Sequence, residues 1–262
     1  MRCTPALGLA ILLLSALTLV GAGAADDDIA TIRRNERRSF SDSEIVDGFL
    51  KVAFGAEFRF GRQTDRIRKY DRPVRVFIEN RAKPDRQSQV VDIIADIKTR
   101  MKDLDIAVTA DRNEANAIVR LVYDRDLTQT MRQLYGRENT RKIQRSQDPQ
   151  CLAGFTKDDT FRIQHSEVIL VVDVGDFTFL DCAYEEILQA LGPINDDGSI
   201  PWTMFNDDVS LGFFGIYDQL LMNILYDPRV RPGMTRAEVQ GLLPSILPDV
   251  RAFVARTNNL PQ

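Results

Sequence analysis

Apolar residues recur every three or four positions in several segments of the chain, which is the spacing of one face of a helix. Two of these segments begin with a capping box, in which Ser or Thr is followed three residues later by Glu: Ser41 with Glu44, and Thr235 with Glu238. The pattern therefore predicts helices, over residues 41–54, 85–104, 181–191, 220–226, after 235, and over 248–257.

Alternating or continuous apolar runs lie between these helices and predict strands. Every second residue from Val74 to Ile78 is β-branched, and short apolar runs follow at 106–109 and 117–123. The nearly continuous apolar run over 168–174 is typical of a strand that is covered on both faces. We expect an α+β fold: one domain with a mixed sheet packed against helices and a mostly helical C-terminal part.

Residues 125–150 break this pattern. Basic side chains between Arg132 and Arg145 stand among Gln, Asn and Thr, with few apolar residues to bury. This composition favours a solvated excursion or loop over a basic docking surface. The role of the basic segment 132–145 stays open.

The composition excludes several kinds of site. The chain contains one histidine and three cysteines, so it cannot form an HExxH zinc site, a four-cysteine module or a site with two cysteines and two histidines. Its 34 basic and 38 acidic residues give a net charge of −4. We therefore expect no nucleic-acid partner.

The N-terminal residues have the features of a secretory signal. Arg2 precedes an uncharged, mostly apolar run over residues 6–20, and Ala22-Gly23-Ala24 fits the A-x-A cleavage pattern. Because the run is shorter than the ~20 residues of a membrane span, we expect cleavage near Ala24 and no membrane span afterwards. The protein is then periplasmic or secreted, and its chain divides into a signal peptide (1–24), a flexible leader (25–40) and one domain (41–262).

Two cysteines, Cys151 and Cys182, remain after cleavage. An exported chain meets an oxidising compartment, where an even pair of cysteines usually forms a disulfide. Closing a loop of this length is worth roughly 3–4 kcal/mol in the chain-entropy model. The alternative, a reactive thiol, needs a neighbouring base, and His165 is the only histidine. We therefore favour the disulfide.

The segment from Glu185 to Asp196 carries the strongest indication of chemistry. On a helix, Glu185 and Gln189 are four residues apart and lie on one face. Gly192 then allows a sharp turn that returns Asn195 or Asp196 toward the same face.

This spacing resembles the metzincin metallopeptidase signature, H-E-x-x-H-x-x-G-x-x-H or -D. In that register Glu185, Gln189 and Asn195 occupy the three ligand positions, Glu186 the position of the general base and Gly192 that of the turn glycine. Metzincin-like domains also place a strand, a helix and further strands ahead of this helix, as the pattern predicts here.

The resemblance extends downstream. Met204, within Thr203-Met204-Phe205, is similar to the methionine turn of metzincins, and the segment from Asp218 to Tyr226 is similar to their closing helix. The resemblance implies a metzincin-like (zincin) fold with a cleft beneath the helix, and the residues that would line it are Glu185, Glu186, Gln189, Asn195, Asp196 and Met204.

The C-terminal half is also similar to a bacterial exported domain of unknown function, numbered 2927. The similarity covers roughly residues 70–245, and its matching blocks are Cys182-Ala183-Tyr184-Glu185-Glu186, Gln189-Ala190-Leu191-Gly192, Asn195-Asp196, Phe205-Asn206-Asp207, Leu225-Tyr226-Asp227-Pro228-Arg229 and Pro232-Gly233-Met234. No activity is established for that family, and its members carry Glu and Gln where peptidases carry His. The similarity therefore indicates a fold and implies no reaction.

The departures from the metzincin signature change the expected chemistry. Zinc prefers imidazole or thiolate ligands, whereas EExxQxxGxxN offers one carboxylate and two amide oxygens, which suit hard ions such as Ca²⁺ or Mg²⁺. We expect no metal and no cofactor; if a metal binds, its ligands would be Glu185, Gln189 and Asn195. The other acidic residues downstream lack calcium-loop spacing and are interpreted as solvated loop residues: Asp196, Asp197, Asp207 and Asp208.

Three interpretations of Glu185, Glu186 and Gln189 stay open. In the first, the residues serve only as hydrogen-bonding groups on a helix. In the second, they line a cleft that binds a peptide or an envelope protein without cutting it. In the third, they belong to a divergent hydrolase that uses a hard metal ion or a carboxylate pair, such as Glu185 with Asp196, with Glu186 as the candidate base. We favour binding without catalysis, because the zinc ligands of the signature are absent.

Overall fold

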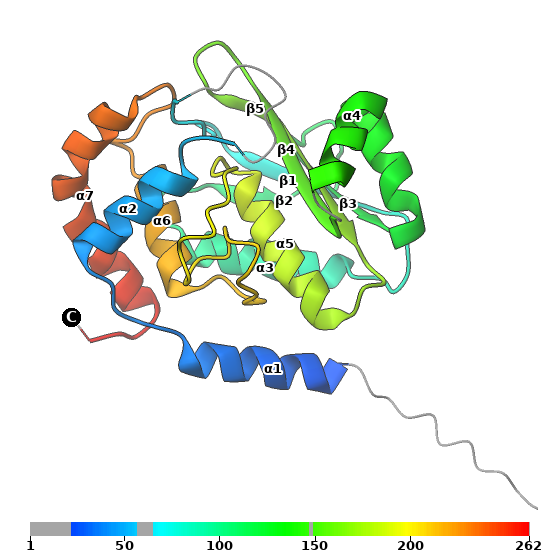
Figure 1. Ribbon diagram of the computed structural model, residues 1–262, viewed down its shortest axis with the longest axis horizontal. Helices are drawn as coiled ribbons and strands as arrows, with labels where there is room; N and C mark the ends of the chain where they lie inside the picture. Colours follow the sequence, from blue (N-terminus) through cyan, green and yellow to red (C-terminus); the bar gives the residue numbers. More distant parts are fainter. Residues whose placement is uncertain (1–21, 57–64, 147–148, 262) are drawn as a thin grey trace, which may run out of the picture.

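The computed structural model describes residues 22–56, 65–146 and 149–261. Its strands form one mixed sheet in the order β2-β1-β3-β5-β4, in which β4 is antiparallel to β5 and every other neighbouring pair is parallel (Figure 1). The strands are β1 (Val74–Asn80), β2 (Ile106–Val108), β3 (Ala117–Val122), β4 (Cys151–Lys157) and β5 (Ile163–Val171). The expected α+β fold with a mixed sheet is confirmed.

Helices cover both faces of this sheet. One face packs against α3 and α5, and the other packs against α4, while α2, α6 and α7 pack together beside the sheet (Figure 1). The helices are α1 (Ala22–Asn35), α2 (Asp42–Val52), α3 (Gln87–Arg100), α4 (Asp124–Ser146), α5 (Asp176–Gln189), α6 (Ile216–Tyr226) and α7 (Arg236–Thr257). Both predicted capping boxes are present, at the starts of α2 and α7.

The flexible leader over residues 25–40 stays a prediction, and the structure shows which local conformation much of this range adopts. Helix α1 occupies most of it and runs beside α5 (Figure 1). Ile29 and Ile32 pack against the main core, and the carboxylate of Glu36 accepts the N–H of Ile216 at the start of α6. These contacts pack α1 and the residues after it against the rest of the protein. Most of the predicted signal peptide, residues 1–21, lies outside the described residues.

The prediction of a loop over residues 125–150 is wrong, because most of this range is helical. Helix α4 is interrupted at Gly136, whose φ of 79° and ψ of 166° separate two helical pieces. Leu127, Met131 and Ile143 are buried against β4 and β5 in a second, smaller apolar cluster. Leu127, Met131 and Leu134 have the spacing of a short helical stripe, but they stand among many basic and polar residues, and this composition favoured a loop.

No helix in the described part of the chain combines the length and the apolar character needed to cross a membrane. One edge of the sheet is formed by strand β4, which the sequence pattern did not predict. Its position matters because the candidate functional residues lie beside it.

Candidate functional site

Helix α5 carries the central candidate residues. Glu186 and Gln189 are buried on it, and Glu185 is half-buried. The amide nitrogen of Gln189 donates to Glu185 Oε1 at 3.4 Å and to Asp196 Oδ1 at 2.8 Å. Glu185 and Gln189 thus project together, four residues apart on one face, and Asp196 returns to meet them.

Gly192 makes this return possible. Its φ is +139°, and a Cβ atom at this position would lie 2.2 Å from the backbone oxygen of Arg68. Only glycine fits both the backbone conformation and the close approach. Asn195, in contrast, turns away from the site, and its amide donates to the backbone oxygen of Lys51 at 3.0 Å.

These residues line a cleft of about 530 Å³, which we call the acidic cleft. It lies between α5, the start of β4 and the loop that follows Gly192. Five carboxylates line it, and among its described lining residues there is no lysine or arginine; the five are Asp181, Glu185, Glu186, Asp196 and Asp207. Ligand oxygens of Glu185, Asp196 and Asp207 all lie within 4.8 Å of one another.

The electrostatics of the acidic cleft are unfavourable for anions. Burial, followed by the neighbouring charges of Glu186 and Asp196, raises the pKa of Glu185 well above its usual range. Asp181 has a different role: it accepts the backbone N–H groups of Leu211 and Gly212 at 2.7 and 2.9 Å, and so holds the loop against α5. The cleft therefore gathers acidic side chains on a helix and a loop that Asp181 holds together.

Strand β4 forms the opposite wall. A disulfide joins Cys151 on β4 to Cys182 on α5, with a Cα–Cα distance of 5.9 Å, so the predicted pairing is confirmed. The N–H of Val171 donates to the backbone oxygen of Gln150, the residue before β4. This bond shows which backbone groups of β4 face β5, because they alternate along an antiparallel strand. In this register every second residue, from Cys151 to Phe155, directs its backbone N–H and C=O away from β5, toward the open edge.

Other residues that the sequence singled out lie outside the acidic cleft. Met204 is buried, and its N–H donates to Asp218 Oδ2 at 3.2 Å, while the Thr203 hydroxyl donates to Asp218 Oδ1. Met204 therefore anchors the loop from within the core. His165 is on β5, and its ring nitrogen lies 2.9 Å from Glu167.

Asp181 and Asp207 complete the acidic lining, and the sequence pattern did not identify either of them as a site residue. Asp207 is nearby in sequence to Asp196, but its convergence with Glu185 depends on the path of the loop. The only available signal was the density of acidic residues between positions 181 and 208.

The residues present do not fit the zinc ion of a metzincin. Gln189 directs its NH₂ group toward two carboxylates and acts as a donor to them. Cys182 is in a disulfide, and His165 lies elsewhere. Three clustered carboxylates offer only oxygen ligands, which suit hard cations and organic ammonium or guanidinium groups.

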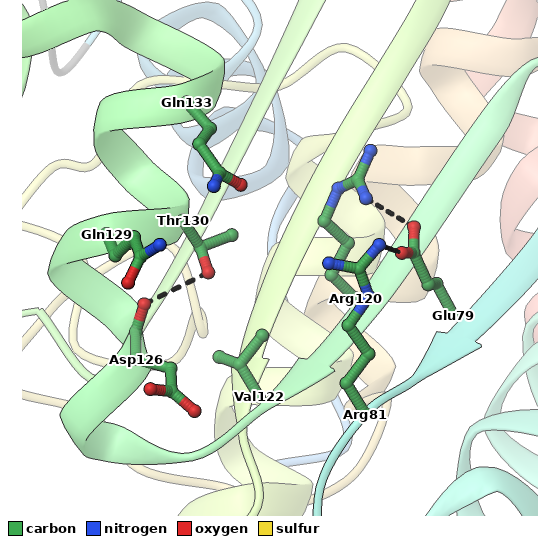
Figure 2. A pocket seen from close by; sticks show the side chains of 8 residues that line it. All are labelled: Glu79, Arg81, Arg120, Val122, Asp126, Gln129, Thr130 and Gln133. Carbon is green, nitrogen blue, oxygen red and sulfur yellow. Dashed lines mark hydrogen bonds and ion pairs between the residues drawn. The ribbon is translucent and has the colours of Figure 1, made fainter.

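A smaller hollow of about 210 Å³ lies on the α4 side of the sheet, lined in part by Glu79, Arg81 and Arg120 (Figure 2). Both arginines form ion pairs with Glu79, and Arg120 also pairs with Glu167 at 2.9 Å. The charges in this hollow are thus balanced by the protein itself, and we interpret the hollow as a structural ion network.

A family model described as "Protein of unknown function (DUF2927)" matches residues 42–245. The matched range runs from α2 into α7 and so includes the whole sheet, α5 and the residues of the acidic cleft. No match to the chain was found among curated proteins or among solved structures.

Proposed function

Since the chain belongs to the DUF2927 family of proteins of unknown function, we propose its activity from the geometry of the acidic cleft: it binds a cationic, extended peptide segment without cutting it. The observation that carries this proposal is the lining of the cleft. Five carboxylates converge there, and the described lining residues supply no basic side chain. A lysine or arginine of a partner would provide the missing positive charge.

The open edge of β4 supports an extended peptide as the partner. Edge strands present unpaired backbone groups, and an added strand satisfies them by backbone hydrogen bonding. Because Cys151 and its neighbours on β4 border the acidic cleft, a peptide along this edge would pass the carboxylates of α5. Backbone bonds would supply affinity, and the acidic cleft would select a basic side chain.

We propose binding without cleavage because the side chains near Glu186 are not zinc ligands of the metzincin kind. In the metzincin-like interpretation, Glu186 would be the general base, but the described residues around it provide no ligand set for a zinc ion. The order of β1, α3, β2, β3, β4, β5 and α5 agrees with the strand, helix and further strands expected ahead of the site helix, which supports this ancestry. We propose that the fold derives from a peptidase and that its cleft now serves as a binding site.

We also propose that this binding takes place outside the cytoplasm, in the cell envelope. The N-terminal signal pattern and the disulfide both support export. The partner would then be a peptide or an envelope protein with an exposed basic segment.

To test the proposal, the mature protein is titrated calorimetrically with a peptide of alternating Lys and Val and, separately, with a peptide of alternating Glu and Val. The basic peptide should bind, the acidic peptide should not, and Glu185→Gln should weaken binding about tenfold, which corresponds to about 1.4 kcal/mol. Asp92→Asn, an equal charge change on the exposed face of α3, is the matched control and should leave the affinity unchanged. Equal binding of both peptides would exclude the proposal.

A hydrolase with a hard metal ion is the second candidate, because Glu185, Asp196 and Asp207 bring their oxygens within 4.8 Å of one another. Elemental analysis of the purified protein, together with a peptidase assay on the wild type and on Glu186→Gln, decides between the two. Stoichiometric metal and an activity that disappears in Glu186→Gln would favour the hydrolase. Peptide binding without cleavage would favour the first proposal.

A further inference from the structure

A second cleft, of about 590 Å³, lies farther along β4, where the strand passes α4 on one face and the segment before β1 on the other. We call it the Arg68 cleft. Its lining is largely apolar and comes from α4, β4 and the loop after α5; the apolar residues include Leu134, Leu152, Ala153, Phe155 and Ile194.

Arg68 lines this apolar cleft although its side chain carries a charge. The residue is only 4% exposed, and its Nε has no hydrogen-bond partner among the described residues. One terminal nitrogen donates to the backbone oxygen of Ala53 at 3.3 Å. Burial lowers the pKa of the guanidinium to about 10, and the charge of Asp65 opposes this only in part. A buried charge of this kind is costly unless an anion neutralises it.

The other polar groups of the cleft favour an anion as well. The Tyr135 hydroxyl, on a residue that lines the cleft, is buried and has no hydrogen-bond partner among the described residues, so the donor capacity of this hydroxyl is unused. Glu167 is the acidic residue of the lining, and its carboxylate forms an ion pair with Arg120 and a hydrogen bond with the His165 ring, each at 2.9 Å. Lys157 adds a further positive charge at the rim.

We propose that the Arg68 cleft binds an apolar group that ends in a carboxylate. The guanidinium of Arg68 would donate to the carboxylate, and the apolar part would lie against Phe155, whose ring centroid is 5.9 Å from the guanidinium carbon of Arg68. This site adjoins the acidic cleft, with which it shares Leu152, but Arg68 lines only the Arg68 cleft, and the five carboxylates of the acidic cleft would repel the same ligand. The proposal therefore does not depend on the peptide-binding function.

Two sources of this chemistry exist: a small organic acid, or the C-terminal residue of a peptide. Calorimetric titration with phenylpropionate and octanoate, each against its neutral alcohol, tests the shared chemistry. The acids should bind at least about tenfold more tightly than the alcohols, because only the acids neutralise Arg68. A tripeptide that ends in Phe, with a free or an amidated C-terminus, distinguishes the sources: tighter binding of the free peptide than of phenylpropionate assigns a chain end.

Arg68→Met provides the decisive variant, because it keeps the bulk of the side chain and removes the charge. Binding of the acids should fall at least about tenfold, while the unfolding temperature of the ligand-free protein should stay the same or rise. If this variant does not fold, Arg68→Lys and the wild-type comparison of acids with alcohols take its place. Asp92→Asn, on the exposed face of α3, should leave acid binding unchanged.

Two results would overturn the proposal. In the first, the wild-type protein binds the alcohols as tightly as the acids. In the second, Arg68→Met binds the acids with the wild-type affinity but unfolds at a lower temperature, which would make Arg68 a purely structural residue. Neither result would bear on peptide binding in the acidic cleft, which is measured with a different probe.

Discussion

The disulfide between Cys151 and Cys182 joins the two walls of the acidic cleft. Cys151 is the first residue of the edge strand β4, and Cys182 is in the helix that carries Glu185 and Gln189. This covalent link fixes the distance between the open strand edge and the carboxylates. Its position explains why the strand and the helix can present one continuous surface to a ligand.

Replacement of both cysteines by serine should therefore cost stability and binding together. The bond spans 31 residues, and closing such a loop is worth roughly 3–4 kcal/mol in the chain-entropy model. Urea unfolding of the double variant measures this loss, and titration with the Lys-Val peptide at a temperature where the variant is folded measures the binding. An unchanged midpoint would contradict the structural role of the bond.

Gly192→Ala should destabilise the protein strongly. The added Cβ would lie 2.2 Å from the backbone oxygen of Arg68 at a φ of +139°, so the turn after α5 would have to open. Strain and displaced packing of this kind cost several kcal/mol, of order 3 or more. Thermal unfolding checks the prediction. Gly241→Ala, in α7, is the control and should be neutral or stabilising, since nothing lies within 4 Å of its added Cβ.

Glu185→Gln should stabilise the protein while it weakens peptide binding. Burial and nearby carboxylates raise the pKa of Glu185, so its ionised form is unfavourable in the folded state. Loss of this charge should raise the unfolding temperature by roughly 2–4 °C for each kcal/mol relieved. The gain should grow as the pH rises, because the repulsion requires the ionised form. A lower unfolding temperature would mean that Glu185 is needed for the fold.

Asp218 should make stability depend on pH. Burial raises its pKa to about 7 from 3.8, so the folded state holds a proton that the unfolded state releases between these values. The free energy of unfolding should therefore fall as the pH rises from about 4 to about 7, by up to about 1.4 kcal/mol per unit.

Urea unfolding of the wild type and of Asp218→Asn across this pH range isolates that contribution. The stability of Asp218→Asn relative to the wild type should rise with pH, because the variant has no carboxyl group to ionise. Asp208→Asn, an exposed change in the loop before α6, should keep the wild-type dependence. A pH dependence that is equal in wild type and Asp218→Asn would show that another group is responsible.

Local patterns predicted much of this fold. The capping boxes at Ser41 and Thr235, the turn at Gly192 and the pairing of Glu185 with Gln189 all depend on residues close in sequence, and the structure confirms them. The cysteine pair could also be predicted, because assigning Cys3 to the expected signal peptide left Cys151 and Cys182 as one possible pair.

Features that depend on distant contacts could not be predicted. Strand β4 contains Ala153 and Gly154, which weaken the alternation, and Gly154 is needed because a Cβ there would meet the Tyr135 hydroxyl at 2.9 Å. Asp207 joins the acidic cleft only through the path of its loop. Arg68 gave no signal at all, because arginine is normally exposed and the residues that surround its side chain, such as Phe155, are distant in sequence.

The central claim is that a cationic peptide binds along the open edge of β4, beside the carboxylates of α5. Hydrogen exchange of backbone amides with and without the Lys-Val peptide tests it most directly. The account predicts slower exchange in the segment from Cys151 to Phe155 when the peptide is bound, and a smaller effect in Glu185→Gln at the same peptide concentration. A bound peptide that leaves exchange in this segment unchanged, or protects only a distant surface, would contradict the account.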